Sequence, residues 1–258
     1  ADFGNFCHEV LRRFGRDRQI RDSREHREIR AYLETEADNL AFQWFGRELT
    51  LPLQIQVHSA KQRLRAAAEI QAREREEGWR IEEAEIQLGS ENWMIAGVMI
   101  RGMVDRVDVH EQSGAIRVLD YKTADEPVQP GMAHAMKITA NTNRDWLPEY
   151  ACFEYNDLQY RWRDLQLPLY RIGLDINSEH DISCGYFNMP KAVGDTGIQT
   201  WDQLCRIHDE AALKCAEGVI HDIQSGQFWP ATNVGRWDDF SPLLLNAPDK
   251  TIDHSLIS

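Results

Sequence analysis

The chain has 258 residues, of which 42% are hydrophobic and 28% charged, a composition typical of globular proteins that excludes an intrinsically disordered one. No apolar run approaches the roughly 20 residues of a membrane-spanning helix, and the first residues lack the pattern of a signal peptide. We therefore expect a cytoplasmic protein without membrane contact. The net charge of −13 argues against a protein that coats nucleic acid non-specifically.

The first part of the chain is predicted to be helical. Apolar residues at positions 6, 7, 10, 11 and 14 recur with the period of a helix. Two further helices are expected over about 24–46 and 53–77. Gly78 is expected to end the helical pattern, since glycine is common just after a helix.

The period changes at Trp79 to the alternation that is typical of strands. Strands are expected over 79–88, over 92–110 in one or two pieces, and over 115–123 after the turn residues 111–114.

The second half of the chain has fewer clear patterns. After a mixed region over 124–163, a helix is expected to start near Asp164, followed by a strand over 181–189 and a helix over 201–225. This order predicts a single α/β domain with a mixed central sheet flanked by helices. Its expected parts are a helical part, a core with the strands, and a C-terminal helix with a tail: 1–78, 79–190 and 191–258.

A predicted hairpin joins two strands that carry acidic residues. With the turn centred on 112–113, paired positions sum to 225, and Asp105 lies directly across from Asp120. Another turn type would shift the register by a residue or two and still leave the carboxylates close. Alternation places Asp120 and Lys122 on one face of the strand and Tyr121 on the other.

Two carboxylates at this distance repel each other unless a proton or a cation lies between them. A hard divalent cation such as Mg²⁺ binds one or two carboxylates together with water and a phosphate oxygen. Lys122 could then orient or polarise the attacking water and offset charge on the phosphate. The pattern indicates phosphodiester hydrolysis, and the alternative is a surface hairpin with an incidental salt bridge.

The segments "GMVDRVDV" and "RVLDYKT" resemble the central motif of the RecB-like branch of the PD-(D/E)XK nuclease superfamily. Two more segments match in the family's order, because "GNFCHEVL" resembles its G-x-x-x-H helix and "LQLPLY" its Q-x-x-x-Y motif. Together they span residues 4–170. The resemblance implies a restriction-endonuclease-like core and a metal-dependent DNA nuclease, expected to be an exonuclease that processes DNA ends in recombination or repair.

The resemblance also implies roles for individual residues. The implied catalytic set is Asp105, Asp120, Lys122, Gln166 and Tyr170. His8 and the backbone carbonyl of Tyr121 would join Asp105 and Asp120 in binding Mg²⁺ or Mn²⁺.

Ordinary structural explanations exist for several of these residues. His8 could be a packed residue of its helix, and Tyr170 a core residue with Gln166 exposed. Glu85 is a further acidic candidate near the site, although alternation along a surface strand explains it equally well.

Two regions are candidates for DNA contacts. Residues 11–30 hold eight arginines against four acids, which indicates either a helix face of ion pairs or a track for phosphates. The aromatic and arginine-rich stretch 146–163 could stack single-stranded bases or form a hydrophobic cap over the sheet. The candidate residues are Arg12, Arg13, Arg16, Tyr160 and Trp162.

The five cysteines have no paired spacing, which is typical of reduced intracellular thiols. We therefore predict no iron–sulfur cluster, although some relatives carry four cluster cysteines. The rival hypothesis is a metalloprotein whose metal is bound by cysteines.

A second rival is a catalytically silent module of the same fold that binds DNA or a protein partner. For the nuclease, DNA and a helicase subunit or domain are the expected partners. No Walker A motif is present, so the motor would lie on another chain or region. Because the chain begins with Ala1, we expect a domain excised from a longer protein.

Overall fold

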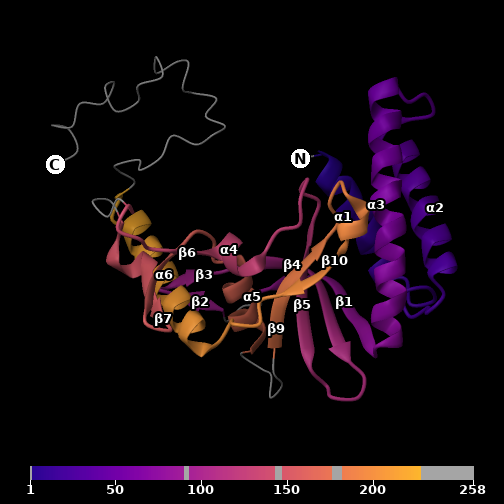
Figure 1. Ribbon diagram of the computed structural model, residues 1–258. Coiled ribbons are helices and arrows are strands. Elements are labelled where there is room, and N and C mark those ends of the chain that lie inside the picture. The colour runs from indigo at the N-terminus through magenta and orange to yellow at the C-terminus, as the bar shows by residue number, and fades with distance from the viewer. Residues whose placement is uncertain (1, 90–92, 143–146, 176–181, 228–258) are drawn as a thin grey trace, which may run out of the picture.

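The computed structural model describes residues 2–89, 93–142, 147–175 and 182–227. A five-stranded mixed sheet lies at its centre, with long helices on one side and shorter helices and a small sheet on the other (Figure 1). The predicted α/β fold with a mixed central sheet flanked by helices is therefore confirmed. Among the helices of these residues, none has the length and apolarity needed to cross a lipid bilayer.

The helices lie close to the positions predicted for them, except α4 (Pro130–His134), which falls in the region 124–163 where no helix was predicted. They are α1 (Asp2–Arg16), α2 (His26–Phe45), α3 (Leu51–Glu76), α4 (Pro130–His134), α5 (Gln166–Asp175) and α6 (Arg206–Gln224). Gly78 follows α3 with a φ of 94°, a left-handed conformation that glycine adopts without strain, and β1 begins at the next residue. This confirms the predicted change of structure at Gly78.

The strands of the described residues fall into three sheets. The central sheet has the order β1 (Trp79–Leu88), β4 (Gly102–His110), β5 (Ile116–Lys122), β9 (Ile182–Asn188) and β10 (Gly197–Thr200). A hairpin joins β2 (Met94–Ile95) to β3 (Val98–Met99), and a three-stranded sheet has the order β6 (Ala135–Lys137), β8 (Leu158–Trp162) and β7 (Cys152–Tyr155). The strand β10 extends the central sheet beyond the expected core of 79–190.

The register of the central hairpin agrees with the prediction. Arg106 pairs with Leu119 and Val109 with Ile116, so that paired positions sum to 225. Strand β5 also pairs with β9, and this pairing is parallel. The sheet is therefore mixed, and β5 lies in its middle.

Alternation along β5 divides the core into two layers. Leu119 and Tyr121 pack against α1, α2 and α3, whereas Val118 packs on the opposite face with Leu167 of α5. Helix α1 buries Phe6, Cys7, Val10, Leu11 and Phe14 against its layer, and each of these is at most 4% exposed. As a result, Asp120 faces the layer of α5 while α1 covers the other face.

The small sheet of β6, β8 and β7 was missed by the sequence patterns, which left 124–163 without regular structure. Its strands are three to five residues long, too short for a reliable alternation signal. The aromatic residue Trp146 and the expected tail after residue 227 lie outside the described residues.

Candidate active site

Asp105 lies where the ladder between β4 and β5 ends. The last ladder pair at this end is Arg106 with Leu119. Beyond it, Oδ2 of Asp105 accepts a hydrogen bond from the backbone N–H of Tyr121 at 2.9 Å. The Asp105 side chain thereby replaces a backbone acceptor, and it stays 18% exposed. The carboxylate is held firmly and remains accessible from outside.

His8 reaches this carboxylate from α1. Its Nδ1 lies 3.4 Å from Oδ2 of Asp105, and its ring packs edge-on against the ring of Tyr121 with centroids 5.7 Å apart. Burial lowers the pKa of His8, but the hydrogen bond to Asp105, the charges of Asp105 and Asp120, and a hydrogen bond to the Tyr121 backbone raise the pKa above its ordinary value. A backbone group that raises the pKa of an imidazole must accept a hydrogen bond from it. The group of Tyr121 that faces the His8 ring is therefore its carbonyl.

The close approach of α1 depends on Gly4. A Cβ atom at Gly4 would lie only 3.2 Å from Oγ1 of Thr123, the residue that follows Lys122. Gly4 precedes His8 by about one helical turn, so both face the end of β5. The spacing of glycine and histidine in α1 thus has a packing reason, which the sequence motif contained without explaining it.

Asp120 is buried beside two polar partners. Only 5% of the residue is exposed, and its Oδ1 accepts a hydrogen bond from Nε2 of Gln166 at 2.8 Å. The Lys122 Nζ lies 2.7 Å from Oδ2, but off the direction of a hydrogen bond, so that within the described residues no donor is aligned with this buried oxygen. Burial and repulsion by Asp105 raise the pKa of Asp120, although Lys122 and His8 oppose this.

Gln166 and Tyr170 hold the two strands together from α5. Besides its bond to Asp120, Nε2 of Gln166 lies 3.0 Å from the Tyr170 hydroxyl, which in turn donates to the carbonyl of Met103 on β4 at 2.5 Å. The backbone N–H of Gln166 bonds Oδ1 of Asp164 at 2.7 Å, near the helix start predicted from that aspartate. Gln166 is therefore not a surface residue of an otherwise apolar helix.

Lys122 lies on the same face as Asp120, as predicted, and its side chain is 29% exposed. Its Nζ also lies 4.7 Å from the ring centroid of Tyr186 on the neighbouring strand β9. The lysine is thus fixed between a carboxylate and an aromatic face, with its end open to solvent.

Glu85 forms ion pairs with α1. It lies on β1 with a φ of 52°, and its Oε2 is 3.5 Å from both Nε of Arg12 and Nη2 of Arg16. Arg12 and Arg13 also pair with Glu9, and Arg13 bonds Glu36. The arginines form the ion-paired face that was one of the two alternatives, and DNA binding by Arg12, Arg13 and Arg16 stays a prediction.

The remaining candidates lie in the small sheet, away from the aspartates. Trp162 is 8% exposed and stacks on Phe153, with ring centroids 4.5 Å apart. Tyr160 is half-buried, and its ring stacks on the ring of Phe153 with centroids 5.5 Å apart. Trp162 packs in a hydrophobic cluster, whereas Tyr160 keeps an accessible ring. DNA binding by Tyr160 and Trp162 stays a prediction.

Asp108 lies on the same strand, three positions after Asp105. It is completely buried, and it bonds Arg106 at 2.5 Å and Arg117 at 2.8 Å. Arg117 also bonds Glu74 of α3 at 2.7 Å. Asp108 therefore belongs to a buried ionic network that joins the sheet to α3, and not to the site.

His8, Asp105 and Asp120 are the side chains that could hold a divalent cation at this end of the sheet. Among the described residues, no group of three or more His, Cys, Asp and Glu side chains already stands at the spacing of a metal cluster. The chemistry nevertheless fits, because His8, Asp105 and Asp120 influence one another's charge and Asp120 keeps a buried oxygen without a hydrogen-bond donor. A bound cation would relieve the repulsion between the carboxylates of Asp105 and Asp120. Cys7, Cys184 and Cys215 are buried in hydrophobic clusters, and the absence of an iron–sulfur cluster stays a prediction.

Two carboxylates and a lysine at the end of paired strands in a mixed α/β sheet suit a protein that acts on phosphate esters. The comparison with protein families agrees, since residues 1–235 match the PD-(D/E)XK nuclease superfamily. The chain belongs to this superfamily, whose members are nucleases and generally use divalent metal ions. No curated protein matches the chain.

Proposed function

We propose that the protein is a deoxyribonuclease that hydrolyses phosphodiester bonds with Mg²⁺ or Mn²⁺. The observation that supports this is the meeting of His8 from α1, Asp105 from β4 and Asp120 from β5 at one end of the sheet. Lys122 lies beside them, and Gln166 braces the buried carboxylate. A silent module would gain nothing from burying Asp120, whose pKa is raised by burial and by the neighbouring carboxylate of Asp105.

Each residue has a task in this reaction. His8, Asp105, Asp120 and the carbonyl of Tyr121 would hold the metal, which when bound supplies an electrophile for the phosphate and lowers the pKa of water. Lys122 would donate a hydrogen bond to the attacking water or to a non-bridging phosphate oxygen as negative charge develops.

Gln166 and Tyr170 are positioning residues. The amide of Gln166 keeps Asp120 in one orientation, and the Tyr170 hydroxyl fixes the amide and the backbone of Met103. The two strands that carry the aspartates are thereby kept in one relative position, which preorganises the site.

The biological role extends the resemblance of the four sequence motifs to the RecB-like branch. On that basis the protein is proposed to degrade DNA from its ends in recombination or repair, together with a helicase. An end-dependent enzyme would cleave linear DNA and leave covalently closed circular DNA intact.

The test is a cleavage assay on end-labelled linear single-stranded and duplex DNA and on closed circular DNA, with Mg²⁺, with Mn²⁺ or with EDTA. Lys122→Ala and Asp120→Asn should lower the rate by about 100-fold or more. Lys61→Ala is the matched control, because Lys61 also pairs with an aspartate, Asp38, but on the α2–α3 pair. DNA binding without cleavage would identify the silent module instead, and equal cleavage by wild type and Lys122→Ala would overturn the catalytic role of Lys122.

A further inference from the structure

A groove lies over the small three-stranded sheet, beside α4. Its volume is about 420 Å³, which is in the size range of ligand-binding pockets. Aromatic rings of Phe153, Tyr155, Tyr160 and Trp201 line it, and the cations of Lys137 and Arg163 lie along its edge. The proposed cleavage mechanism uses none of these residues.

The aromatic rings are held rigidly. Phe153 packs between Tyr160 and Trp162, with interplanar angles of 20° and 25°, so the Tyr160 ring is supported from behind. Tyr155 and Tyr160 are half-buried and therefore still offer surface to a ligand. A flat ring system that stacks on such preorganised aromatics loses little conformational entropy of the protein.

The cations of the groove are available for an anion. Lys137 and Arg163 are exposed, and within the described part of the chain neither forms an ion pair with a carboxylate; Arg163 donates a hydrogen bond to the carbonyl of Met132 at 3.4 Å. By contrast, Arg12 and Arg13 of α1 are bound to Glu9. In a chain with a net charge of −13, unpaired cations at the rim of an aromatic groove indicate a ligand that combines flat rings with negative charge.

The groove is joined to the candidate active site by a continuous series of contacts. The ring of Tyr186, which lies beside Lys122, bonds through its hydroxyl to Nε2 of His134 at 2.7 Å. The His134 ring stacks on Trp201 at 5.6 Å with an interplanar angle of 11°, and Trp201 lines the groove. Arg163 stands three positions before Gln166 in the sequence. Tyr186 and His134 are buried, so this series fixes the position of the groove relative to Lys122 through the core.

We propose that this groove binds unpaired bases of a single-stranded nucleic acid whose backbone passes the active site. Bases stack on Tyr160 and Tyr155, while Lys137 and Arg163 contact phosphates. Base pairs of an intact duplex cannot enter, because their faces are already stacked on neighbouring pairs. This inference rests on the proposed nuclease function and adds the form of the substrate, a single strand or a frayed end.

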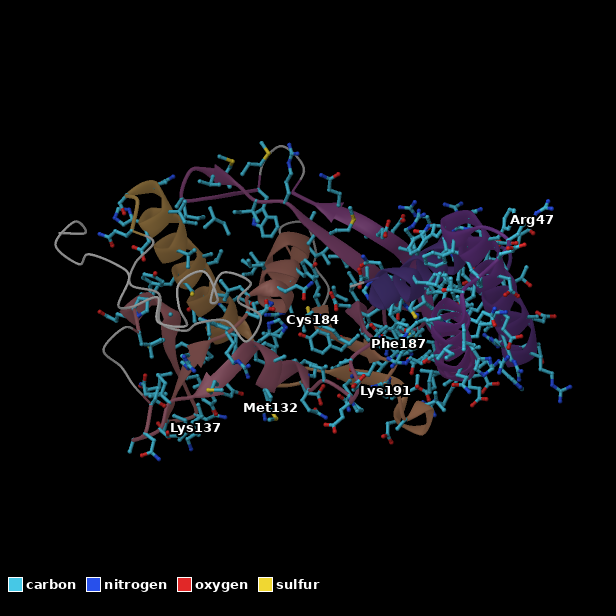
Figure 2. All side chains as sticks on the ribbon, turned by 90° about the horizontal axis from the view of Figure 1, so that it is seen from above. Arg47, Met132, Lys137, Cys184, Phe187 and Lys191 are labelled. Carbon is cyan, nitrogen blue, oxygen red and sulfur yellow. The ribbon has the colours of Figure 1, made fainter. Side chains whose placement is uncertain are left out.

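The position of the groove can be followed in Figure 2. Lys137 lies toward one end of the molecule, Met132 lies between it and the middle, and Arg47 lies at the opposite end. Met132 is 72% exposed and lines the groove, so its flexible side chain could cover a bound base. Arg47 is exposed and provides a control position for loss of a positive charge.

The test measures binding by fluorescence anisotropy in EDTA, which prevents cleavage. The labelled probes are a 12-nucleotide oligothymidylate, the oligouridylate of the same length, and a blunt 12-base-pair DNA duplex. Wild type should bind the single strands about 10-fold more tightly than the duplex, and the ratio of the two single strands identifies DNA or RNA as the source of the ligand.

Variants assign this binding to the groove. Tyr160→Ala should weaken single-strand binding about 10-fold, the loss expected from one base–aromatic stack, whereas Tyr160→Phe should bind as wild type. Arg163→Ala should reduce the salt dependence of single-strand binding by the amount that corresponds to about one phosphate contact. The matched Arg47→Ala should leave the salt dependence unchanged. Lys137→Glu leaves the core untouched and should also weaken binding, which covers the case that Tyr160→Ala does not fold.

Two results would overturn the proposal. One is wild-type affinity for single strands in folded Tyr160→Ala and Lys137→Glu, and the other is equal affinity of wild type for single strands and duplex. If the same protein still cleaves DNA in a Lys122-dependent way, only the groove fails and the nuclease stands. If wild type neither binds nor cleaves any nucleic acid, both proposals fall together.

Discussion

Asp105 and Asp108 lie three positions apart on strand β4, yet they have opposite environments. Asp105 accepts a hydrogen bond from the backbone of Tyr121 at 2.9 Å and is 18% exposed. Asp108 is fully buried between the guanidinium groups of Arg106 and Arg117. One carboxylate is accessible from outside, and the other joins structural elements.

The two aspartates should therefore respond in opposite ways to the same substitution. Asp105→Asn keeps an oxygen that can accept from Tyr121, so the fold should be retained while cleavage falls by about 100-fold or more. Asp108→Asn leaves two buried arginines short of a negative charge and should cost about 3–5 kcal/mol of unfolding free energy. Cleavage rates and urea denaturation measure the two effects. A stable Asp108→Asn or an active Asp105→Asn would contradict this assignment.

Tyr170→Phe should show that the hydroxyl acts on the site as well as on stability. Tyr170 donates to the Met103 carbonyl, and Tyr150 makes a comparable bond to Asp222 on α6. Each Phe substitution should cost about 1 kcal/mol of stability. Only Tyr170→Phe should also reduce cleavage, by about 10-fold, and raise the Mg²⁺ concentration for half-maximal rate. Equal activity of Tyr150→Phe and Tyr170→Phe would mean that the bond is purely structural.

Gln166→Ala should weaken metal binding more than it weakens the fold. The substitution removes the donor at 2.8 Å from Oδ1 of Asp120, so the carboxylate can turn away from the site. We expect a 10- to 100-fold loss of activity, as is typical when the hydrogen-bond partner of a metal ligand is removed. Most of the lost activity should return at a high concentration of Mg²⁺. Gln159→Ala is the matched control, because Gln159 donates to the exposed carboxylate of Glu154 at 2.7 Å. Calorimetric titration with Mn²⁺ provides a readout that does not depend on activity, and unchanged Mn²⁺ affinity would refute the role.

His208 should make the folded state sensitive to acid. Burial, with help from the charge of Arg171, lowers the pKa of His208 from 6.5 to about 4. Because the folded pKa is below the unfolded one, the stabilisation is complete above pH 6.5 and is lost as the pH falls from 6.5 towards 4. The loss at pH 4.5 should be roughly 2 kcal/mol.

The measurement is urea unfolding at pH 7 and pH 4.5 for wild type and two variants. In His208→Gln the difference between the two pH values should shrink by the amount that His208 contributes. His58→Gln, at an exposed position, should keep the wild-type difference. If His208→Gln and wild type lose the same stability on acidification, the buried histidine is not the responsible group.

The hairpin of β4 and β5 could be predicted in detail because its information is local. A short turn determines the register of two antiparallel strands, and the observed pairing of Arg106 with Leu119 agrees with it. Alternation then places Asp120 beside Lys122, as their 2.7 Å ion pair shows. The helical position of His8 followed from period and spacing in the same way.

Other features depend on contacts between distant parts of the chain. The short strand β10 pairs with β9, and the small sheet packs short aromatic strands on α6, so neither has a sequence period of its own. Glu85 could not be separated from its neighbours by alternation, and its role in ion pairs depends on where α1 lies.

The sequence by itself determined the mixed α/β class, the hairpin register and the residue types of a phosphodiester site, because periodicity, turn chemistry and charge are encoded over a few residues. Only the tertiary structure decided that the imidazole of His8 faces Asp105, that Gln166 bonds Asp120, and that Asp108 is structural. The first two relationships arise from packing α1 and α5 on opposite faces of the sheet, and the third arises from the buried ion pairs that reach α3. Packing is a property of shapes brought together from far apart in the chain, and so no local pattern contains it.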